Sequence, residues 1–471
     1  MPRTRTSSTV EVLVSIDRAA SQPLHRQVER ELRTAIRRGR LGPSAVLPSS
    51  RALAEQLGVS RGIVVEAYEQ LVAEGYLAAR PGGATTVAGS AVTIVERRAR
   101  EVTARPEIDF RPGRPDLDSF PRTAWLRSIR RVLIGSPSER LGYSDGRGLP
   151  ELRTALAAYL NRVRGTSADP DDVVVTTGFV QGVALIAAVL RTGGARRLAM
   201  EDPSQVEARE AIRGAGLEVI GMPVDGDGIR PDALEAADAD AVLVTAAHQF
   251  PTGAVLPPER RARLVAWAVR RNGIVIEDDY DAEFRYDRAP IGAIQGLDPD
   301  RVVYAGSASK VLAPGLRLGW LVAPPRLADR LAAAKKAADH GSAALDQLAF
   351  ADFLERGELD RHLRRLRPFY RARRDTLLAA LRAHLPGLQP AGASAGLHVL
   401  AWLPPGLDDV AAAEAARAAG IAIEALGPHW LGRPERGGLV FGYGSIDEQS
   451  IEPAVVRLAG VLAALERAAG A

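Results

Sequence analysis

The chain has 471 residues, too many for one ordinary domain, so two or three domains are expected. Its 46% apolar and 25% charged residues are typical of globular proteins with sizeable buried cores. The absence of cysteine excludes disulfides, thiolate catalysis and thiolate metal sites, and we expect no metal. No apolar run reaches the ~20 residues of a membrane helix, and the N-terminus has no secretion signal. We therefore predict a cytoplasmic protein with no membrane partner.

The net charge of +4 is unevenly distributed. Residues 1–105 contain sixteen arginines and ten acidic residues, a charge of +6, whereas the remainder carries −2. A basic N-terminal segment on a mildly acidic body is consistent with binding to a polyanion. A solvated basic surface would have the same composition, so charge alone does not decide between the two.

Residues 22–88 have the pattern of a winged helix-turn-helix. Leu24, Val28, Leu32 and Ile36 recur every four residues and predict a helix that ends near Gly39. The stretch "SSRALAEQLGVSRGIVVEAYEQLVAEGYL" then predicts two short helices around a turn at Gly58, the first capped by Ser49 or Ser50 and the second by Ser60. "GYLAARPGGATTVAG" predicts a β-hairpin. The expected shared core is Leu53, Leu57, Val59, Ile63, Val64, Tyr68 and Leu71.

The polar residues of this segment suit contact with DNA. The second helix of such a motif places its N-terminal residues in the major groove, and a wing can reach the minor groove. The predicted DNA-binding residues are Ser50, Arg51, Ser60, Arg61 and Arg80. A generic helical bundle with capping serines is the alternative. "LPSSRALAEQLGVSRGIVVEAYEQLVAEGYL" resembles the DNA-binding head of GntR-type bacterial regulators.

After a predicted linker at residues 89–106, apolar strand-like runs alternate with Ala/Leu/Arg-rich helical stretches. The runs are "DVVVTTG", "RRLAMED", "AVLVTAAH", "GIVIEDDY", "RVVYAGSAS" and "RLGWLVAP". This alternation predicts an α/β fold with a mainly parallel sheet. "RHLRRLRPFYRARRDTLLAALRAHL" predicts a long basic amphipathic helix, and "GLHVLAWLP" and "GLVFGYG" predict strands of a smaller C-terminal lobe.

Lys310 is conspicuous because the chain has only three lysines, the others being Lys335 and Lys336. Ser307-Ala-Ser-Lys310 fits the Ser-x-x-Lys pattern of acyl-enzymes, but the Lys-Thr-Gly element is missing. A Walker loop is also missing. A Schiff base with an aldehyde cofactor requires an amine that arginine cannot supply. Lys310 is therefore interpreted as a Schiff-base lysine, with a surface lysine as the alternative.

A pyridoxal phosphate site also needs a carboxylate for the pyridine nitrogen and donors for the phosphate. Asp278, Asp279 and Tyr280 end a predicted strand, at the sheet edge where α/β proteins bind ligands. Gly178 lets the backbone N–H groups of residues 178–180 approach a phosphate at a helix start. Further phosphate ligands are expected from Ser307, Ser309 and Arg317.

These motifs carry a second resemblance. "YSDGRGLPELR", "TTGFVQG", "AHQFPTG", "EDDYDAEFRY" and "SASKVLAPGLRLGW" resemble fold-type I aminotransferases, and more closely the MocR-type regulators, over nearly all of 22–471. The resemblance implies that Lys310 holds pyridoxal 5'-phosphate, Asp278 pairs with its pyridine nitrogen and Tyr280 bonds its phenolic oxygen. The phosphate would be held by the backbone of Phe179 and Val180 and by Ser307, Ser309 and Arg317. His248 to Gly253 stand where aminotransferases have Asn-Pro-Thr-Gly.

Two positions depart from the aminotransferase pattern. Gln205 stands where an aromatic residue usually stacks on the cofactor ring, a contact worth about 0.5–1.5 kcal/mol. Leu439 and Val440 stand where an arginine would clamp a substrate carboxylate, and Arg433 and Arg436 are out of register. Loss of this clamp would impair the orientation of an amino-acid substrate and argues against full transamination.

The predicted architecture is an N-terminal extension (1–21), a winged helix-turn-helix domain (22–88), a linker (89–106) and a fold-type I aminotransferase-like body (107–471). The predicted function is that of a DNA-binding transcriptional regulator that senses pyridoxal phosphate, or an amine or amino acid reacting with it, in control of vitamin B6 metabolism. An active aminotransferase with an accessory DNA-binding domain, and a body that only dimerises, are the alternatives. Operator DNA and a second copy of the chain are the expected partners, and the resemblance implies a head-to-tail homodimer.

Overall fold

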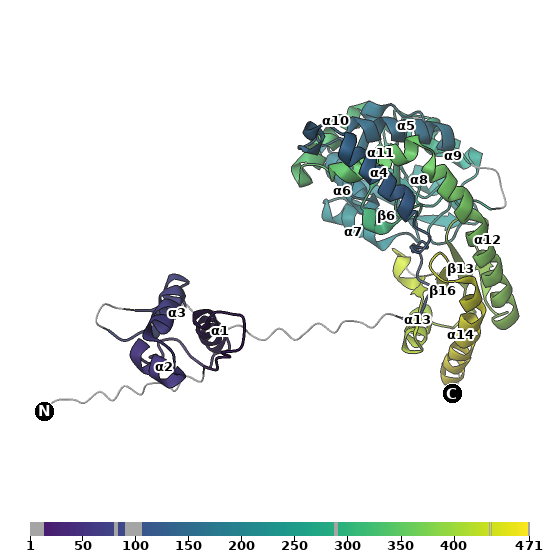
Figure 1. Ribbon diagram of the computed structural model, residues 1–471. Helices are drawn as coiled ribbons and strands as arrows, with labels where there is room; N and C mark the ends of the chain where they lie inside the picture. The colour runs from purple at the N-terminus through teal and green to yellow at the C-terminus, as the bar shows by residue number, and fades with distance from the viewer. Residues whose placement is uncertain are drawn as a thin grey trace. The chain divides into compact units, whose positions relative to one another are not determined.

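A computed structural model describes residues 14–79, 83–89, 106–286, 291–432, 434 and 436–469. The chain divides into two compact units, Met1–Ala104 and Arg105–Ala471, called here the head and the body (Figure 1). Arg80, Arg433 and most of the expected linker lie outside the described residues. None of the helices in the described ranges is long and apolar enough to cross a membrane.

The head is a winged helix-turn-helix, as predicted. It consists of α1 (Leu24–Arg37), α2 (Ser50–Leu57), α3 (Arg61–Ala73) and the antiparallel strands β1 (Leu77–Ala78) and β2 (Thr86–Val87). Ser49 is the N-cap of α2, where its side chain accepts a hydrogen bond of 3.2 Å from the amide of Ala52. Gly58 ends α2 with a φ of 62°, a left-handed conformation that glycine adopts without strain.

The three helices of the head share one core. Its buried members include Val28, Leu32, Leu53, Val64, Tyr68 and Leu71. Leu57, Val59 and Ile63 were expected in the same core but are only half-buried against it. These three side chains flank the tight α2–α3 turn, where fewer neighbours are available to cover them.

The centre of the body is an eight-stranded mixed sheet in the order β4-β11-β10-β9-β8-β5-β6-β7. The strands are β4 (Val173–Thr176), β5 (Arg197–Asp202), β6 (Glu218–Asp225), β7 (Gly228–Ile229), β8 (Ala241–Val244), β9 (Ile274–Asp278), β10 (Val302–Ser307) and β11 (Gly319–Val322). The neighbours from β10 to β6 pair in parallel, as the alternating pattern predicted. The sheet is mainly parallel, as predicted, with two exceptions: β11 is antiparallel to both of its neighbours and β7 is antiparallel to β6.

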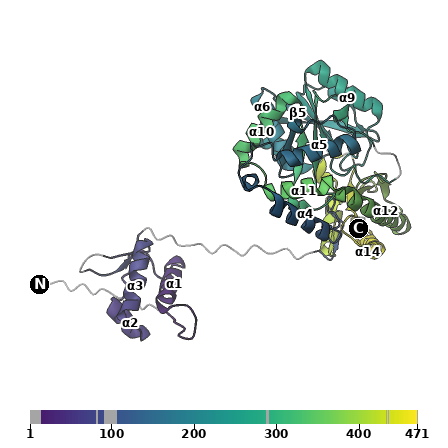
Figure 2. The ribbon, with the colours of Figure 1, turned by 45° about the horizontal axis from the view of Figure 1, so that its top comes forward.

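Helices cover both faces of this sheet (Figure 2). One apolar layer joins the sheet to α6 (Phe179–Thr192), α7 (Val206–Gly214) and α10 (Pro325–Asp339). The opposite face packs on α4 (Arg122–Gly135), α5 (Pro150–Arg164), α8 (Pro231–Ala236), α9 (Pro258–Arg271) and α11 (Ala344–Glu355). Short 3₁₀ turns occur at Ser138–Leu141, Pro170–Asp172, Ile294–Gly296, Pro314–Leu316 and Gly427–His429.

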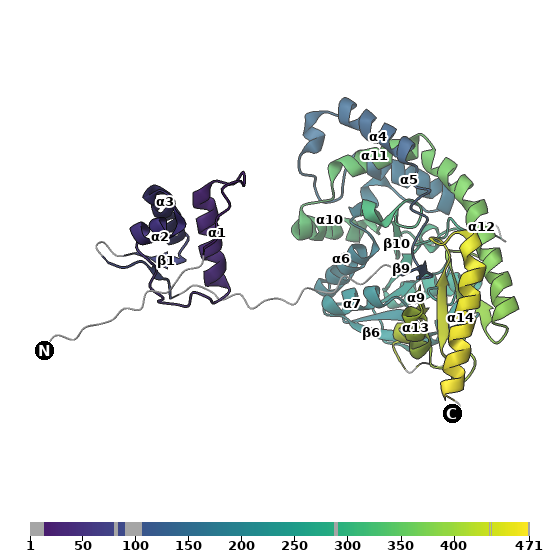
Figure 3. The ribbon, with the colours of Figure 1, turned by 60° about the horizontal axis from the view of Figure 1, so that its bottom comes forward.

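The long basic helix is α12 (Glu358–His384), and it leads into the smaller C-terminal lobe. The elements of this lobe are β12 (Gln389–Ala391), β13 (His398–Trp402), α13 (Asp409–Ala418), β15 (Glu424–Ala425), β16 (Gly438–Gly442) and α14 (Glu448–Ala469). Helices α12 and α14 pack side by side (Figure 3). Strands β12, β13, β16 and β15 form a four-stranded sheet in that order. A separate two-stranded sheet joins β3 (Ile108–Asp109) to β14 (Ile421–Ala422), which ties the start of the body to this lobe.

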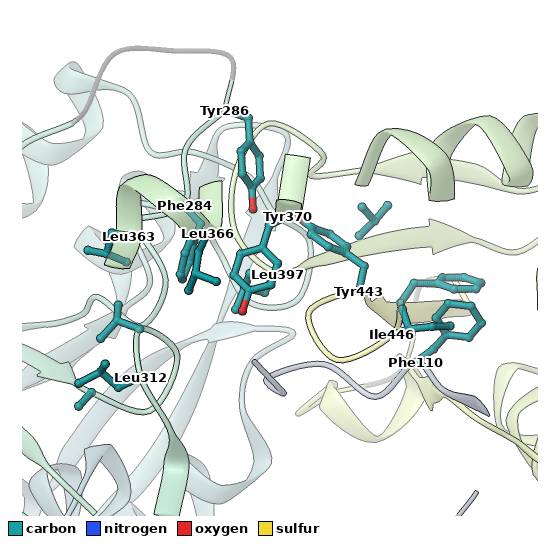
Figure 4. Packing of buried hydrophobic residues seen from close by; sticks show 14 of the residues in the cluster. Phe110, Phe284, Tyr286, Leu312, Leu363, Leu366, Tyr370, Leu397, Tyr443 and Ile446 are labelled. Carbon is teal, nitrogen blue, oxygen red and sulfur yellow. The ribbon is translucent and has the colours of Figure 1, made fainter. Parts of the chain in front are cut away.

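An aromatic core joins the small lobe to the rest of the body (Figure 4). Phe284 lies after β9 and packs edge-to-face on Tyr370 of α12, with 5.0 Å between ring centroids. Tyr286 and Tyr443 both donate hydrogen bonds to the carbonyl oxygen of Gly396. This core fixes the small lobe beside the carboxyl ends of β9 and β10, where the candidate site lies.

Candidate functional site

A cavity of about 330 Å³ lies at the carboxyl edge of the sheet, where β9 and β10 end and α6 and α7 begin. It gathers eight of the nine predicted cofactor-binding residues: Phe179, Val180, Asp278, Tyr280, Ser307, Ser309, Lys310 and Arg317. The ninth, Gly178, is the N-cap of α6 and precedes the lining residue Phe179. Residues that come from separate loops of the sequence are thus brought together by the sheet.

Lys310 lies at the cavity wall, three residues after β10. Its Nζ donates a hydrogen bond of 2.8 Å to the carbonyl oxygen of Gly113, which lies after β3. Burial lowers the pKa of Lys310, and the carboxylates of Asp281 and Asp278 oppose this shift. A lowered pKa increases the fraction of neutral amine, the form that reacts with aldehydes.

Asp278 and Asp279 are both buried but have different surroundings. Asp278 lines the cavity, and burial together with the charge of Asp279 raises its pKa well above the usual range. Asp279 forms a buried ion pair of 2.6 Å with Arg164 and accepts a hydrogen bond of 2.8 Å from Tyr304. Since Asp279 is paired with Arg164 and Tyr304, and Asp278 lines the cavity, Asp278 is the carboxylate available to a cationic ring nitrogen.

One end of the cavity is built for an anion. The N-terminus of α6 has no side-chain cap, so its first backbone N–H groups are available to a ligand. Gly178 has a φ of 117°, and a Cβ there would lie 3.2 Å from the guanidinium of Arg317. Ser307 and Ser309 line the same cavity. This arrangement combines hydroxyl groups, backbone donors and one arginine, the groups that hold a phosphate.

His248 connects Tyr280 to Asp281 under the cavity. Its Nδ1 lies 3.1 Å from Oδ2 of Asp281 and 3.0 Å from the hydroxyl of Tyr280, which also donates to the His248 carbonyl at 2.9 Å. His398 packs on His248 at 4.7 Å between ring centroids, and burial lowers its pKa well below the usual range. The side-chain ligand atoms of His248, Asp281 and His398 lie within 4.8 Å of one another, close enough to share a metal ion. Both imidazoles, however, already have hydrogen-bond partners.

The two departures from the aminotransferase pattern are visible in the cavity. Gln205 lines it, and its Nε2 lies 3.4 Å from Oδ2 of Asp278. Leu439 and Val440 are buried in β16, and Arg436 faces elsewhere, with hydrogen bonds to Leu403 and Gln389. Among the described residues that line the cavity, Arg317 is the one arginine, and it belongs to the anion end.

Several residues that line the cavity were not predicted from the sequence as site residues. These are Pro112, Gly113, Glu207, Phe250, Asp281, Pro314, Leu397, His398, Glu424 and His429. Asp281 stands inside the "EDDYD" motif, where strand-end acidic residues are a detectable signal. Gly113 lies near the start of the body, whereas His398 and Glu424 belong to the small lobe. These residues are near Lys310 only because of how the lobes pack, which local sequence patterns do not indicate.

The predicted DNA-binding residues of the head that the structure describes lie around the α2–α3 turn. Ser60 is the N-cap of α3, and no side-chain hydrogen bond caps this helix. Nε of Arg61 lies 3.4 Å from the hydroxyl of Ser50. Arg51, Ser60 and Arg61 are exposed, so the start of α3 presents polar groups and free backbone donors to a phosphate or a base. Arg80, predicted on the wing, lies outside the described residues.

Comparison with protein families divides the chain in the same two parts. Residues 24–87 match the family described as bacterial regulatory proteins, gntR family. Residues 106–435 match the family described as aminotransferase class I and II.

Two curated regulators are similar to this chain over nine-tenths or more of its length. The probable rhizopine catabolism regulatory protein MocR of Rhizobium meliloti is 33% identical and aligns over 96% of this chain and 97% of its own. The HTH-type pyridoxine biosynthesis transcriptional regulator PdxR of Corynebacterium glutamicum is 36% identical over 90% of this chain and 93% of its own. Among solved structures, the Pyrococcus horikoshii kynurenine aminotransferase in complex with PMP superimposes with a TM-score of 0.71 at 26% identity, covering 79% of this chain and 96% of that one.

Proposed function

Because this chain belongs to the MocR-type regulators, in which a GntR-type head precedes an aminotransferase-like body, we propose that pyridoxal 5'-phosphate bound at Lys310 controls the affinity of the head for operator DNA. The protein is a DNA-binding transcriptional regulator, a function supported over that of a working aminotransferase because proteins similar over 90–96% of this chain are named regulators. The observation that carries the proposal is the juxtaposition of Lys310 and buried Asp278 in one cavity that also has an anion-binding end.

The residues of the cavity fit the cofactor. Asp278 is buried, and its side chain accepts one long hydrogen bond of 3.4 Å from Gln205 among the described residues. The buried carboxylate therefore has too few hydrogen-bond partners without a cationic ligand. The cofactor's protonated pyridine nitrogen would supply that partner. A Cβ at Gly178 would crowd the guanidinium of Arg317, and the backbone there is therefore open to close approach by a phosphate.

Different residues of the cavity would bind different groups of the cofactor. Lys310 would supply the amine that reacts with the aldehyde, and its lowered pKa keeps more of that amine neutral. Asp278 would hold a proton on the ring nitrogen, and Tyr280, oriented by His248, would contact the phenolic oxygen. Phe179 and Val180 backbone, Ser307, Ser309 and Arg317 would hold the phosphate. When bound, pyridoxal phosphate supplies an aldehyde for amines and a ring that withdraws electrons.

Control of vitamin B6 metabolism is the regulatory role that we propose. One relative, 36% identical over 90% of this chain, is named a pyridoxine biosynthesis transcriptional regulator. The cavity also has no described arginine in position to clamp an amino-acid carboxylate, so the cofactor itself is the simplest signal. Occupation of Lys310 would then report the supply of the vitamin.

We also propose a head-to-tail homodimer, in which the winged helix-turn-helix domain spans residues 22–88 and the aminotransferase-like domain residues 107–471. A single winged helix reads one short half-site, and two-fold pairing lets a regulator read two. The region of α4 and the turn after it exposes apolar side chains that a partner would cover: Leu126, Leu133, Ile134, Leu141 and Tyr143. Light scattering should give a dimer for the wild type and a monomer for Leu126→Glu/Ile134→Glu, whereas Leu297→Glu, an exposed leucine elsewhere on the body, should remain dimeric.

The visible spectrum of the purified protein tests the cofactor assignment. The wild type mixed with pyridoxal phosphate should develop the absorbance of a Lys310-bound cofactor, and Lys310→Ala should not. Lys336→Ala removes a lysine at a distance from the cavity and should leave the band unchanged. A band that persists in Lys310→Ala would contradict the assignment. Keto-acid release on addition of amino acids would instead favour a working aminotransferase.

A further inference from the structure

The part of the cavity beyond Lys310 carries acidic groups. Glu207 lies in the first turn of α7, and Glu424 lies on β15 of the small lobe, so two separate elements each contribute a carboxylate to the cavity wall. Glu207 is exposed and Glu424 is partly exposed, which places both near solvent access. Asp281 lines the same cavity, and its Oδ1 is buried without a hydrogen-bond partner.

The arginines near these carboxylates are occupied elsewhere. Arg111 forms an ion pair of 2.6 Å with Asp109, to which Arg114 also pairs at 3.1 Å. Arg209 of α7 is buried and donates to the carbonyl oxygens of Trp430 and Pro428 at 3.0 Å. None of these arginines is among the described residues that line the cavity. Arg111 also acts electrostatically on Glu424, but from outside the cavity wall. Glu207 and Glu424 are therefore the charged lining groups that a ligand carboxylate would meet at this end.

Helix electrostatics explain only part of this arrangement. An acidic residue in the first turn of α7 is favoured by the helix dipole, which accounts for Glu207 alone. Glu424 lies on a strand, where no helix dipole favours its charge. Its Oε2 lies 3.6 Å from Nε2 of His429. Both glutamates act electrostatically on Lys310, since each opposes the lowering of its pKa by burial. The two glutamates thus line the same cavity as Lys310, and both act electrostatically on its amine.

We infer that the outer end of this cavity binds the cationic end of a diamine, whose other amine meets the cofactor at Lys310. This inference rests on the proposed function, because it requires pyridoxal phosphate in the same cavity. Glu207 and Glu424 select a second positive charge and exclude amino acids, whose carboxylate they repel. The regulator, once loaded with the cofactor, therefore also responds to cationic amines that carry no carboxylate.

Three ligands of equal chain length test this selectivity. They are the diamine putrescine, the monoamine butylamine and the amino acid γ-aminobutyrate, each with four carbons. Each is titrated into the full-length protein loaded with pyridoxal phosphate, with the visible spectrum and the thermal midpoint as readouts. Putrescine should bind about tenfold or more tightly than the other two, since two carboxylates contribute to its binding.

The variants Glu207→Gln and Glu424→Gln should each weaken putrescine binding about three- to tenfold and leave butylamine binding unchanged. Glu207→Lys should invert the preference toward γ-aminobutyrate. Glu210→Gln is the matched control, because Glu210 is on the same helix but pairs with Arg213 and does not line the cavity. It should behave as the wild type, and thermal midpoints without ligand show whether each variant is folded.

Two failures can be distinguished. If the wild type develops the Lys310-dependent band but binds γ-aminobutyrate as tightly as putrescine, the diamine inference is wrong and the proposed function stands. The inference is also wrong if the glutamine variants weaken butylamine as much as putrescine. If the wild type develops no such band, the proposed function fails and the diamine inference fails with it.

Discussion

The amine of Lys310 and the carbonyl oxygen of Gly113 are joined by a hydrogen bond of 2.8 Å, although the residues are 197 positions apart. Gly113 has a φ of 75°, and a Cβ at this position would lie 3.0 Å from Nζ of Lys310. The segment after β3 therefore closes one side of the cavity and fixes the position of the amine. Glycine adopts this backbone conformation without strain, and a side chain here would require the Lys310 amine to shift.

Gly113→Ala should weaken binding of pyridoxal phosphate roughly tenfold, measured by absorbance titration. The added methyl group displaces the Lys310 amine, and an off-rotamer side chain costs about 0.5–1.5 kcal/mol. A loss of about 1.4 kcal/mol in binding free energy raises the dissociation constant tenfold. Gly406→Ala is the matched control, since Gly406 also has a positive φ but has open space around it. Equal affinities for Gly113→Ala and the wild type would show that this contact does not position the amine.

Gln205→Phe should tighten binding of pyridoxal phosphate about 2- to 12-fold, because stacking on an aromatic ring is worth about 0.5–1.5 kcal/mol. It also removes the long hydrogen bond to Asp278 that the cofactor nitrogen would replace. Gln205→Leu removes the same amide without adding a ring and serves as the control. Stopped-flow dissociation should show slower cofactor release for Gln205→Phe alone; equal release rates for both variants would indicate that Gln205 is not beside the ring.

Much of the site was predictable because its residues follow directly on strands. Strand ends of a parallel sheet converge at one edge, so the motifs after β4, β9 and β10 had to meet there. The strand end offered both Asp278 and Asp279, and the resemblance implied Asp278; successive side chains of an extended chain point to opposite faces, so the two carboxylates are expected in different surroundings. Asp279 indeed lies on the side of Arg164 and Tyr304.

The remaining residues of the site depend on long-range packing that local patterns do not encode. Glu424 and His398 reach the cavity because an aromatic core sets the small lobe against the sheet edge. The antiparallel direction of β11 was not predicted for a related reason: "RLGWLVAP" reads as a buried strand in either direction. Likewise, Leu57, Val59 and Ile63 are only half-buried, because few other side chains surround the turn between α2 and α3.

Glu201 should make the stability of the body depend on pH. Burial raises its pKa from 4.5 to about 7, although Thr245 and Gln249 donate hydrogen bonds to its carboxylate. The folded state therefore holds a proton that the unfolded state releases, and this contribution to stability is lost as the pH rises from about 4.5 through 7.

Glu201→Gln lacks this loss. We compare the free energy of unfolding of Glu201→Gln with that of the wild type at each pH. The difference, variant minus wild type, should be more positive at about pH 8 than at about pH 5, by on the order of 3 kcal/mol. Denaturant titrations at the two pH values measure the difference, with the exposed Glu218→Gln as the control. A difference between Glu201→Gln and the wild type that is the same at both pH values would contradict the raised pKa.

Arg61→Ala should weaken operator binding by about 1–3 kcal/mol, or 5- to 150-fold, and leave the cofactor absorbance unchanged. Arg61 is exposed at the first position of α3, next to the unoccupied helix N-terminus. Arg30→Ala, an exposed arginine of α1, is the control in a mobility-shift assay at fixed salt. Wild-type affinity should also fall steeply with salt, as for phosphate contacts. If Arg61→Ala retained wild-type affinity, the recognition helix would have to be assigned elsewhere.

The central claim is that occupation of Lys310 changes how the head binds DNA, and titration of operator DNA against cofactor-free protein tests it most directly. The wild type should change its affinity 5- to 150-fold on addition of pyridoxal phosphate, the range of a coupling of about 1–3 kcal/mol between two sites. Lys310→Ala should bind the same operator with an affinity that pyridoxal phosphate does not alter. If the cofactor leaves the affinity and the footprint of the wild type unchanged, or alters Lys310→Ala equally, the two sites are not coupled through Lys310.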